Sequence, residues 1–291
     1  MIKQLFKSAV MACALTSSAV FAVPVDLGLA GDYTLLSAGQ IPQGSLNLGS
    51  SSHIYGNVGA RWVVGAAPGT IIEGDLHGGY INAAPGLVVT GETRTLSDAE
   101  WDAIFADLSA ASAQALGMGM FGTNLGAISE STILNATGSL SVFNVNGSIN
   151  LNNGKSLTLK GNASDQFVIN VSNDFFLCKD AFIGCDAGII LDGVSADNVL
   201  FNMYGAGLAQ VNGDFVGAMR GNFISAGNFS WILGDGMVFD QVRILAGNIP
   251  TANVQDVFGI TPPPVNVPEP SLLLMFGFSL LGLGLARRRQ R

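Results

Sequence analysis

The chain has 291 residues, of which 48% are hydrophobic and only 12% are charged. Within residues 23–267, twenty acidic residues outnumber seven basic ones, which gives a net charge of −13. Such a surface repels phosphate backbones and anionic lipids, so the charge argues against nucleic acid as a partner and favours polysaccharides bridged by divalent cations. The length allows one large core, and nothing in it requires a second domain.

The N-terminus reads as a signal peptide over residues 1–22. Lys3 and Lys7 precede a mostly apolar stretch, and Val20-Phe21-Ala22 places small residues where signal peptidase reads. We expect cleavage after Ala22. A lipoprotein signal using Cys13 is the alternative, but Met11 is unusual at its position and the preceding apolar stretch is very short.

The region that follows repeats short apolar runs, each broken by Gly, Asn or Asp. Such runs occupy residues 140–145, 156–159, 166–171 and 198–202. Strands this short cannot bury their own apolar face, so they must stack on similar neighbours, with Gly and Asn at the corners. The pattern predicts a mostly β fold, an irregular and discontinuous β-solenoid over residues 23–259. A β-sandwich is the alternative interpretation.

One segment has helical rather than β periodicity. Ser97 and Glu100 form a capping box, apolar residues follow at helical spacing from Trp101 onward, and Gly117 is a stop signal. The sequence predicts a long helix over about residues 97–116, packed alongside the solenoid with Phe105 and Leu108 on its apolar stripe. A groove for a partner helix is the alternative.

Two cysteines follow the signal peptide, Cys178 and Cys185. An exported chain meets an oxidising compartment, so this short loop predicts a structural disulfide. A redox or metal role would favour a tighter spacing or nearby histidines.

Residues that could carry out catalysis or bind metal are scattered. His53 and His77 could face each other on adjacent coils, but the sequence offers no third ligand, and it contains no G-x-S-x-G, H-E-x-x-H or phosphate loop. Five aspartates could suggest a carbohydrase cleft, although each sits beside turn-forming residues: Asp192, Asp197, Asp214, Asp235 and Asp240. We therefore predict a protein that is not an enzyme, with no catalytic, cofactor-binding or metal-binding residues.

Calcium is a separate possibility, because oxygen-bearing side chains cluster in residues 162–165, 172–174 and 212–214. None of these segments matches an EF-hand loop or a glycine-aspartate nonapeptide repeat. Stacked asparagine ladders are the favoured interpretation, and no cofactor is predicted.

The C-terminus has three parts. A proline-rich linker, residues 260–267, leads to Pro268, Glu269 and Pro270, then to a sixteen-residue apolar segment (271–286), and finally to Arg287, Arg288, Arg289 and Arg291. A helix of this length spans roughly 24 Å, short of the ~30 Å hydrocarbon core, which favours a transient membrane span. The basic tail should stay in the cytoplasm, with the body on the far side of the inner membrane.

This tail, residues 268–291, resembles the PEP-CTERM sorting signal of Gram-negative bacteria. The resemblance implies recognition by an exosortase-type enzyme, cleavage near Pro268-Glu269-Pro270, and release to the cell envelope, cell surface or extracellular matrix. An ordinary membrane anchor would account for the apolar helix and the arginines but not for the Pro-Glu-Pro.

The body resembles choice-of-anchor A domains and bacterial ice-binding solenoids. The resemblance rests on the inserted helix and on residues 27–33, 72–76, 142–145, 198–202, 221–227 and 242–247. It implies the solenoid fold with a flanking helix and leaves the ligand open. We predict an adhesive or scaffolding protein of the cell envelope or exopolysaccharide. Ice binding is the alternative, although Thr93-Arg94-Thr95 is the only T-x-T motif and an arginine interrupts it.

Overall fold

The structure, a computed structural model, describes residues 24–40, 44–179, 184–212 and 217–260. These residues form parallel β-ladders and one long α-helix, so the prediction of a mostly β fold with one helix is confirmed. All strand pairings between them are parallel, as expected for a solenoid and not for an antiparallel sandwich. The signal peptide, the tail of residues 268–291 and all but Ile260 of the linker lie outside the described residues. No helix among the described residues is long and apolar enough to cross a membrane.

The first half of the solenoid grows outward from the N-terminal coil. Strand β1 pairs with β4, β4 with β6, and β6 with β8, the last strand in this direction. The bounds are β1 Tyr33–Ser37, β2 Leu46–Leu48, β3 His53–Tyr55, β4 Asn57–Ala66, β5 Ile71–Glu73, β6 Leu76–Ala83, β7 Val88–Val89 and β8 Thr93–Thr95.

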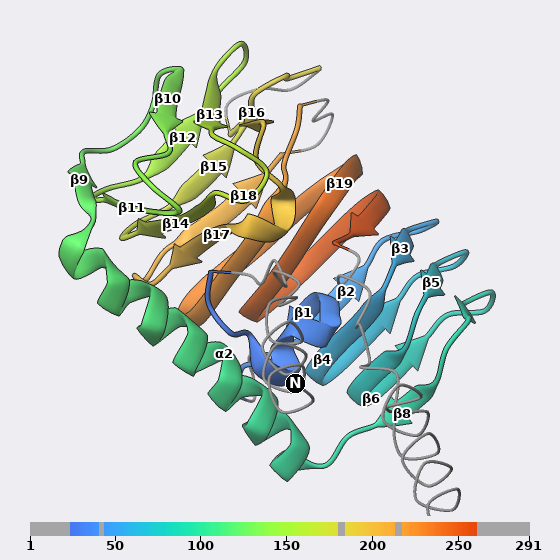
Figure 1. The fold of residues 1–291 in the computed structure, drawn as a ribbon. Helices are drawn as coiled ribbons and strands as arrows, with labels where there is room; N and C mark the ends of the chain where they lie inside the picture. Colours follow the sequence, from blue (N-terminus) through green and yellow to red (C-terminus); the bar gives the residue numbers. More distant parts are fainter. Residues whose placement is uncertain (1–23, 41–43, 180–183, 213–216, 261–291) are drawn as a thin grey trace, which may run out of the picture. The chain divides into compact units, whose positions relative to one another are not determined.

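Helix α2, Asp98–Met118, then carries the chain along the solenoid to its other end, where the coils stack back toward the middle (Figure 1). The bounds are β9 Thr123–Leu125, β10 Thr132–Asn135, β11 Leu140–Val145, β12 Ile149–Leu151, β13 Ser156–Lys160, β14 Gln166–Val171, β15 Phe175–Leu177, β16 Gly188–Asp192, β17 Val199–Met203, β18 Leu208–Val211 and β19 Gly221–Gly259. Short 3-10 turns occupy Gly28–Asp32, Gly119–Phe121 and Ala196–Asn198.

The two halves join where β19 lies between β17 and β1. On one side Phe223 aligns with Phe201, and on the other Leu245 aligns with Leu36. The ladder therefore runs β8-β6-β4-β1-β19-β17-β14-β11-β9, so the last coil of the sequence docks on the first. Buried Arg243 spans this junction, because its guanidinium donates to the Tyr33 carbonyl at 3.0 Å and to Asn222 Oδ1 at 2.7 Å.

Inward-facing side chains fill the solenoid with aliphatic and aromatic residues. Phe201 and Phe223 stack with ring centroids 4.7 Å apart, and Phe175 and Trp231 pack against them. All four side chains are fully buried. Similar side chains stack from coil to coil because the parallel register places equivalent positions directly above one another.

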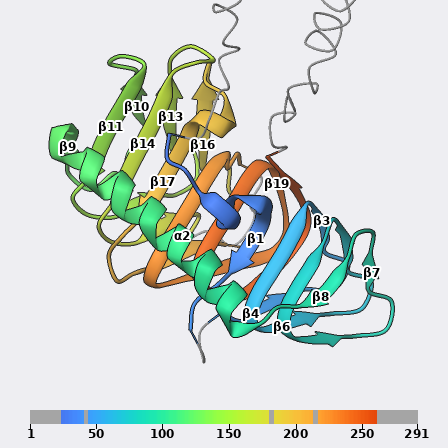
Figure 2. The same ribbon diagram turned by 60° about the horizontal axis from the view of Figure 1, so that its bottom comes forward.

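Helix α2 covers the outer side of this long ladder, and the two ribbon views agree on its placement (Figures 1 and 2). Its buried residues Trp101, Ile104 and Leu108 join one apolar cluster with outward-facing residues of four strands, β1, β19, β17 and β14: Leu36, Leu245, Ile224, Leu200 and Val168. Phe105 of the predicted stripe is only partly buried, and Leu116 is 43% exposed. The helix therefore seals a sheet face that would otherwise expose apolar surface.

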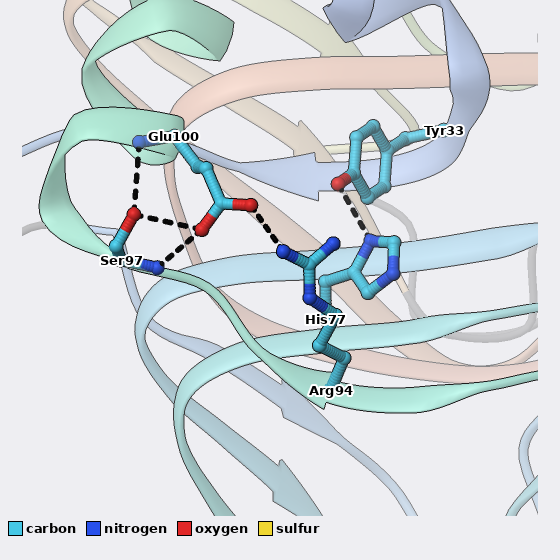
Figure 3. A network of polar contacts seen from close by, with 5 residues as sticks. All are labelled: Tyr33, His77, Arg94, Ser97 and Glu100. Atoms are coloured by element: carbon cyan, nitrogen blue, oxygen red, sulfur yellow. Dashed lines mark hydrogen bonds and ion pairs between the residues drawn. The ribbon is translucent and has the colours of Figure 1, made fainter.

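The start of α2 is fixed by polar contacts (Figure 3). Ser97 and Glu100 form the reciprocal capping box predicted from the sequence, and Glu100 also pairs with Arg94 of β8. These hydrogen bonds hold the pKa of Glu100 below its ordinary value. Nearby, the Tyr33 hydroxyl lies 2.8 Å from His77 Nδ1, and burial raises the pKa of this phenol.

The end of α2 is fixed by an asparagine ladder, which we define as Asn124, Asn144, Asn170 and Asn202. Adjacent amides hydrogen-bond across the strands at 2.9 to 3.2 Å. The same amides donate to helix-end carbonyls, Asn170 to Ala115 at 2.9 Å and Asn144 to Gly119 at 2.7 Å. The prediction that Gly117 ends the helix is wrong, because these tertiary bonds satisfy carbonyls near the terminus and the helix continues to Met118.

Candidate functional site

The helix-covered face is closed, so candidate binding surfaces must lie on the other faces of the solenoid. One of them, which we call the second face, contains β2 together with the second halves of β4 and β6. The ladder register aligns Asn47, Gly65 and Asn82 in one outward-facing row. Because the middle position lacks a side chain, the row is lowered between its two amides.

A surface hollow of about 340 Å³ lies at this point, lined by residues 47–48, 65–67 and 82–84. No charged side chain lines it. Asn47 donates to the Pro250 carbonyl at 2.7 Å, whereas the Asn82 side chain is exposed and has no hydrogen bond to the described residues. The hollow is thus neutral and small-residue-lined, with two amides at its rim.

Two exposed aromatic residues lie on the strands that carry the hollow, outside its lining. Tyr80 is 62% exposed and, by strand alternation, lies on the same side of β6 as Asn82, opposite the inward-packed Ile81. The register of β4 against β6 shifts between Ala60 and Val63, and Trp62 within this bulge is 40% exposed. Bulges commonly re-aim side chains beside functional sites.

The third face carries a different cluster, where β3 meets the end of β19. Tyr55 stacks on Phe258 and on His53, with ring centroids 4.4 and 4.2 Å apart. His53 Nε2 lies 2.9 Å from Glu73 Oε1. Since its rings stack on one another across the coil junction, the cluster ties the first coil to the last.

The structure does not bring the two histidines together. His53 contacts Glu73, whereas His77 contacts Tyr33. Among the described residues, no group of three or more His, Cys, Asp or Glu side chains is arranged to hold a metal ion.

The candidate carboxylates are dispersed rather than gathered in a cleft. Asp192 pairs with Lys160 and Asp240 pairs with Arg220, both at the surface. Burial raises the pKa of Asp197, and nearby Arg243 partly opposes this. Asp214 and the side chain of Asp235 lie outside the described part of the structure.

The remaining predicted residues separate into two groups. Cys178 and Cys185 are joined by a disulfide, with Cα atoms 5.9 Å apart. The sorting residues Pro268, Glu269 and Pro270, the tail arginines and Ala22 lie outside the described residues. The Asn47, Gly65 and Asn82 row was not recognised in the sequence, because its members come from three different segments.

Comparison with known proteins gives two family matches. The model of an ice-binding-like adhesive domain matches residues 12–224, and the PEP-CTERM protein-sorting motif matches residues 266–290. A comparison with curated proteins found no match.

Solved structures share the fold. An ice-binding protein from an Antarctic biological consortium superposes with a TM-score of 0.57 at 18% identity, covering 81% of this chain and 90% of the other. One from the Antarctic ascomycete Antarctomyces psychrotrophicus gives 0.55 at 18% identity, covering 81% and 98%. A domain from Shewanella frigidimarina ice-binding protein gives 0.55 at 15% identity, covering 82% and 98%.

At these identities the structural likeness establishes the fold alone. The family match covers well over half of the chain, and the C-terminal motif suggests export to the cell surface through exosortase-type processing. The chain belongs to the ice-binding-like adhesive domain family and carries a PEP-CTERM protein-sorting motif at its C-terminus.

Proposed function

We propose that this protein is an exported, non-catalytic adhesive or scaffolding protein of the cell envelope or exopolysaccharide of a Gram-negative bacterium. One observation carries the proposal: a single chain combines an adhesive-domain solenoid with a PEP-CTERM sorting motif. A rigid stack of parallel coils offers extended outer faces, and one of them is already used to dock α2. The uncovered faces are then the surfaces available for adhesion.

In this proposal the two ends of the chain act only in delivery. Signal peptidase cuts after Ala22, and the segment of residues 271–286 holds the chain in the inner membrane. An exosortase-type enzyme then cuts near Pro268-Glu269-Pro270 and releases the body. The linker of residues 260–267 would act as a stiff spacer because prolines favour an extended chain.

The absence of catalysis is also part of the proposal. Of the candidate carboxylates that the structure describes, Asp192 and Asp240 lie in separate ion pairs and Asp197 lies near Arg243, so these three do not form the facing pair that glycoside hydrolysis requires.

Ice binding is the second candidate, because the structural neighbours are described as ice-binding proteins. The outer side chains of this chain give it little support. Thr93 and Thr95 are exposed, but Arg94 lies between them and pairs with Glu100. On the second face, Gly65 interrupts the row of side chains, whereas the familiar ice faces are flat, repeated arrays.

The experiment compares the native producing cells with cells in which Pro268, Glu269 and Pro270 are replaced by alanine. Adhesion predicts that the native protein is recovered with the exopolysaccharide fraction and that the variant stays with the inner membrane. Recovery of both proteins as free, unbound material would contradict the proposal. In parallel, thermal hysteresis and ice-crystal shape are measured with the full chain to separate the two candidate functions. Faceted crystals would favour ice binding, and rounded crystals would exclude it.

A further inference from the structure

We propose that the hollow formed by Asn47, Gly65 and Asn82, together with Tyr80, binds a neutral hexopyranose polysaccharide. This inference rests on the proposed adhesive function and names its ligand class and site.

The shape of the site suits a sugar ring at the surface. The hollow of about 340 Å³ is at the lower end of small-molecule sites, which span roughly 300–1,000 Å³. Its floor depends on Gly65, because a Cβ added there would lie 2.5 Å from Asn47 Oδ1. A glycine at this position therefore keeps both the depth of the hollow and the place of the amide beside it.

The polar groups suit vicinal hydroxyls. A carboxamide offers both a donor and an acceptor, so each asparagine can accept from one hydroxyl and donate to another. Asn82 is exposed and makes no hydrogen bond to the described residues, so its whole amide is available to a ligand. Asn47 uses its Nδ2 for the Pro250 carbonyl, which fixes the side chain and leaves its Oδ1 over Gly65.

The apolar groups suit the C–H face of a pyranose. An aromatic ring carries a negative face that attracts weakly positive hydrogens, and Tyr80 is 62% exposed beside Asn82. Trp62, 40% exposed in the neighbouring bulge, offers a second ring where a longer chain would pass. A polymer that contacts both rings would bind more tightly than a single sugar.

The charge selects a neutral chain. None of the residues lining the hollow is charged, and residues 23–267 carry twenty acidic against seven basic residues. Uronic-acid polymers would meet repulsion without a compensating cation in the lining. At this hollow we therefore place neutral hexopyranose polymers above alginate-like ones, in contrast to the cation-bridged polysaccharides that the net charge of the chain favours.

The test is affinity electrophoresis of the full chain, kept in solution with a nonionic detergent. Gels contain hydroxyethyl cellulose, galactomannan, dextran or alginate. We expect retardation in at least one neutral gel and none in alginate. Tyr80→Ala and Asn82→Ala should each weaken binding roughly tenfold, and Gly65→Ser should weaken it by filling the hollow.

Matched controls use the same residue types elsewhere on the surface. Phe121→Ala removes an aromatic side chain that is 92% exposed in the 3-10 turn after the C-terminus of α2. Asn135→Ala removes an exposed amide of β10. Both should bind as the native chain does. Circular dichroism of every variant checks that the fold is retained.

The outcomes distinguish the proposed site and ligand class from the proposed adhesive function. If the native chain is retarded and the hollow variants bind equally well, the site is wrong while adhesion stands. Retardation by alginate alone, or by no polysaccharide in the panel, overturns the neutral ligand class. If the chain instead shapes ice and is not recovered with exopolysaccharide, both this inference and the adhesive function fail.

Discussion

Asn202 and Ser112 are 90 positions apart in the chain and hydrogen-bond to each other twice. The Ser112 hydroxyl donates to Asn202 Oδ1 at 2.7 Å, and Asn202 Nδ2 donates to the Ser112 carbonyl at 3.1 Å. Both residues are buried, so the pair joins α2 to β17 without help from solvent.

Asn202→Ala should lower the free energy of unfolding by about 1–3 kcal/mol, because it leaves the buried Ser112 hydroxyl without its acceptor. Asn124→Ala, at the exposed end of the same ladder, should change it by only about 0.5 kcal/mol. Urea denaturation measures both. Equal losses of unfolding free energy in the two variants would show that the buried pair of Asn202 and Ser112 stabilises the fold no more than the exposed end of the ladder does.

Packing of the helix should depend on which side of it a leucine occupies. Leu108 is fully buried in the helix cluster, whereas Leu116 of the same helix is 43% exposed. Leu108→Ala should therefore cost about 2–5 kcal/mol, and Leu116→Ala less than about 1 kcal/mol. Thermal and urea unfolding of the two variants give the comparison, and a larger loss from Leu116→Ala would contradict the observed docking face.

Arg243 should stabilise the junction between the first and last coils. Replacing it with methionine leaves the Asn222 amide oxygen and the Tyr33 carbonyl without this donor, at a cost of about 3 kcal/mol or more. Arg220→Met is the control, because Arg220 pairs with Asp240 at the surface and such pairs contribute about 0–1 kcal/mol. Similar small losses from both variants in urea would mean that the coil junction does not depend on Arg243.

Asp197 should make stability fall as pH rises through the acid range. Burial raises its pKa above the ordinary value of 3.8, against the opposing effect of Arg243. The folded state then holds the proton more tightly than the unfolded state, so the free energy of unfolding decreases from about pH 4 upward until the folded protein has also lost that proton. Urea denaturation at several pH values measures this contribution as the free energy of unfolding of the native chain minus that of Asp197→Asn. We expect this value to fall as pH rises. A rise of this value with pH would show that attraction to Arg243 outweighs the effect of burial.

The disulfide closes a short loop. Replacing both Cys178 and Cys185 with serine should lower the free energy of unfolding by about 2–3 kcal/mol through the greater freedom of the unfolded chain. A reducing agent should lower the stability of the native chain by a similar amount and leave the double variant unchanged. If the reductant destabilised both proteins equally, the loss could not be assigned to this bond.

Local signals in the sequence predicted the start of the helix at Ser97, whereas the helix continues to Met118, past the predicted stop at Gly117. The capping box of Ser97 and Glu100 involves residues three positions apart, so the chain itself specifies it. The end depends on Asn144 and Asn170, which bond to carbonyls 25 and 55 positions away. The sequence favoured asparagine ladders at residues 162–165, 172–174 and 212–214, whereas the ladder that docks α2 lies in the segments Phe143-Asn144-Val145, Ile169-Asn170-Val171 and Phe201-Asn202-Met203.

The sequence alone determined that this protein is mostly β with one long helix, and that its C-terminus carries a sorting motif, because these properties follow from contiguous patterns. Only the tertiary structure decided that the N-terminal coil lies in the middle of the ladder, with Leu36 against Leu245. It likewise decided that Asn47, Gly65 and Asn82 share one hollow. The physical reason is that strand register pairs residues distant in sequence, and short apolar runs of similar composition do not specify which neighbour each will take.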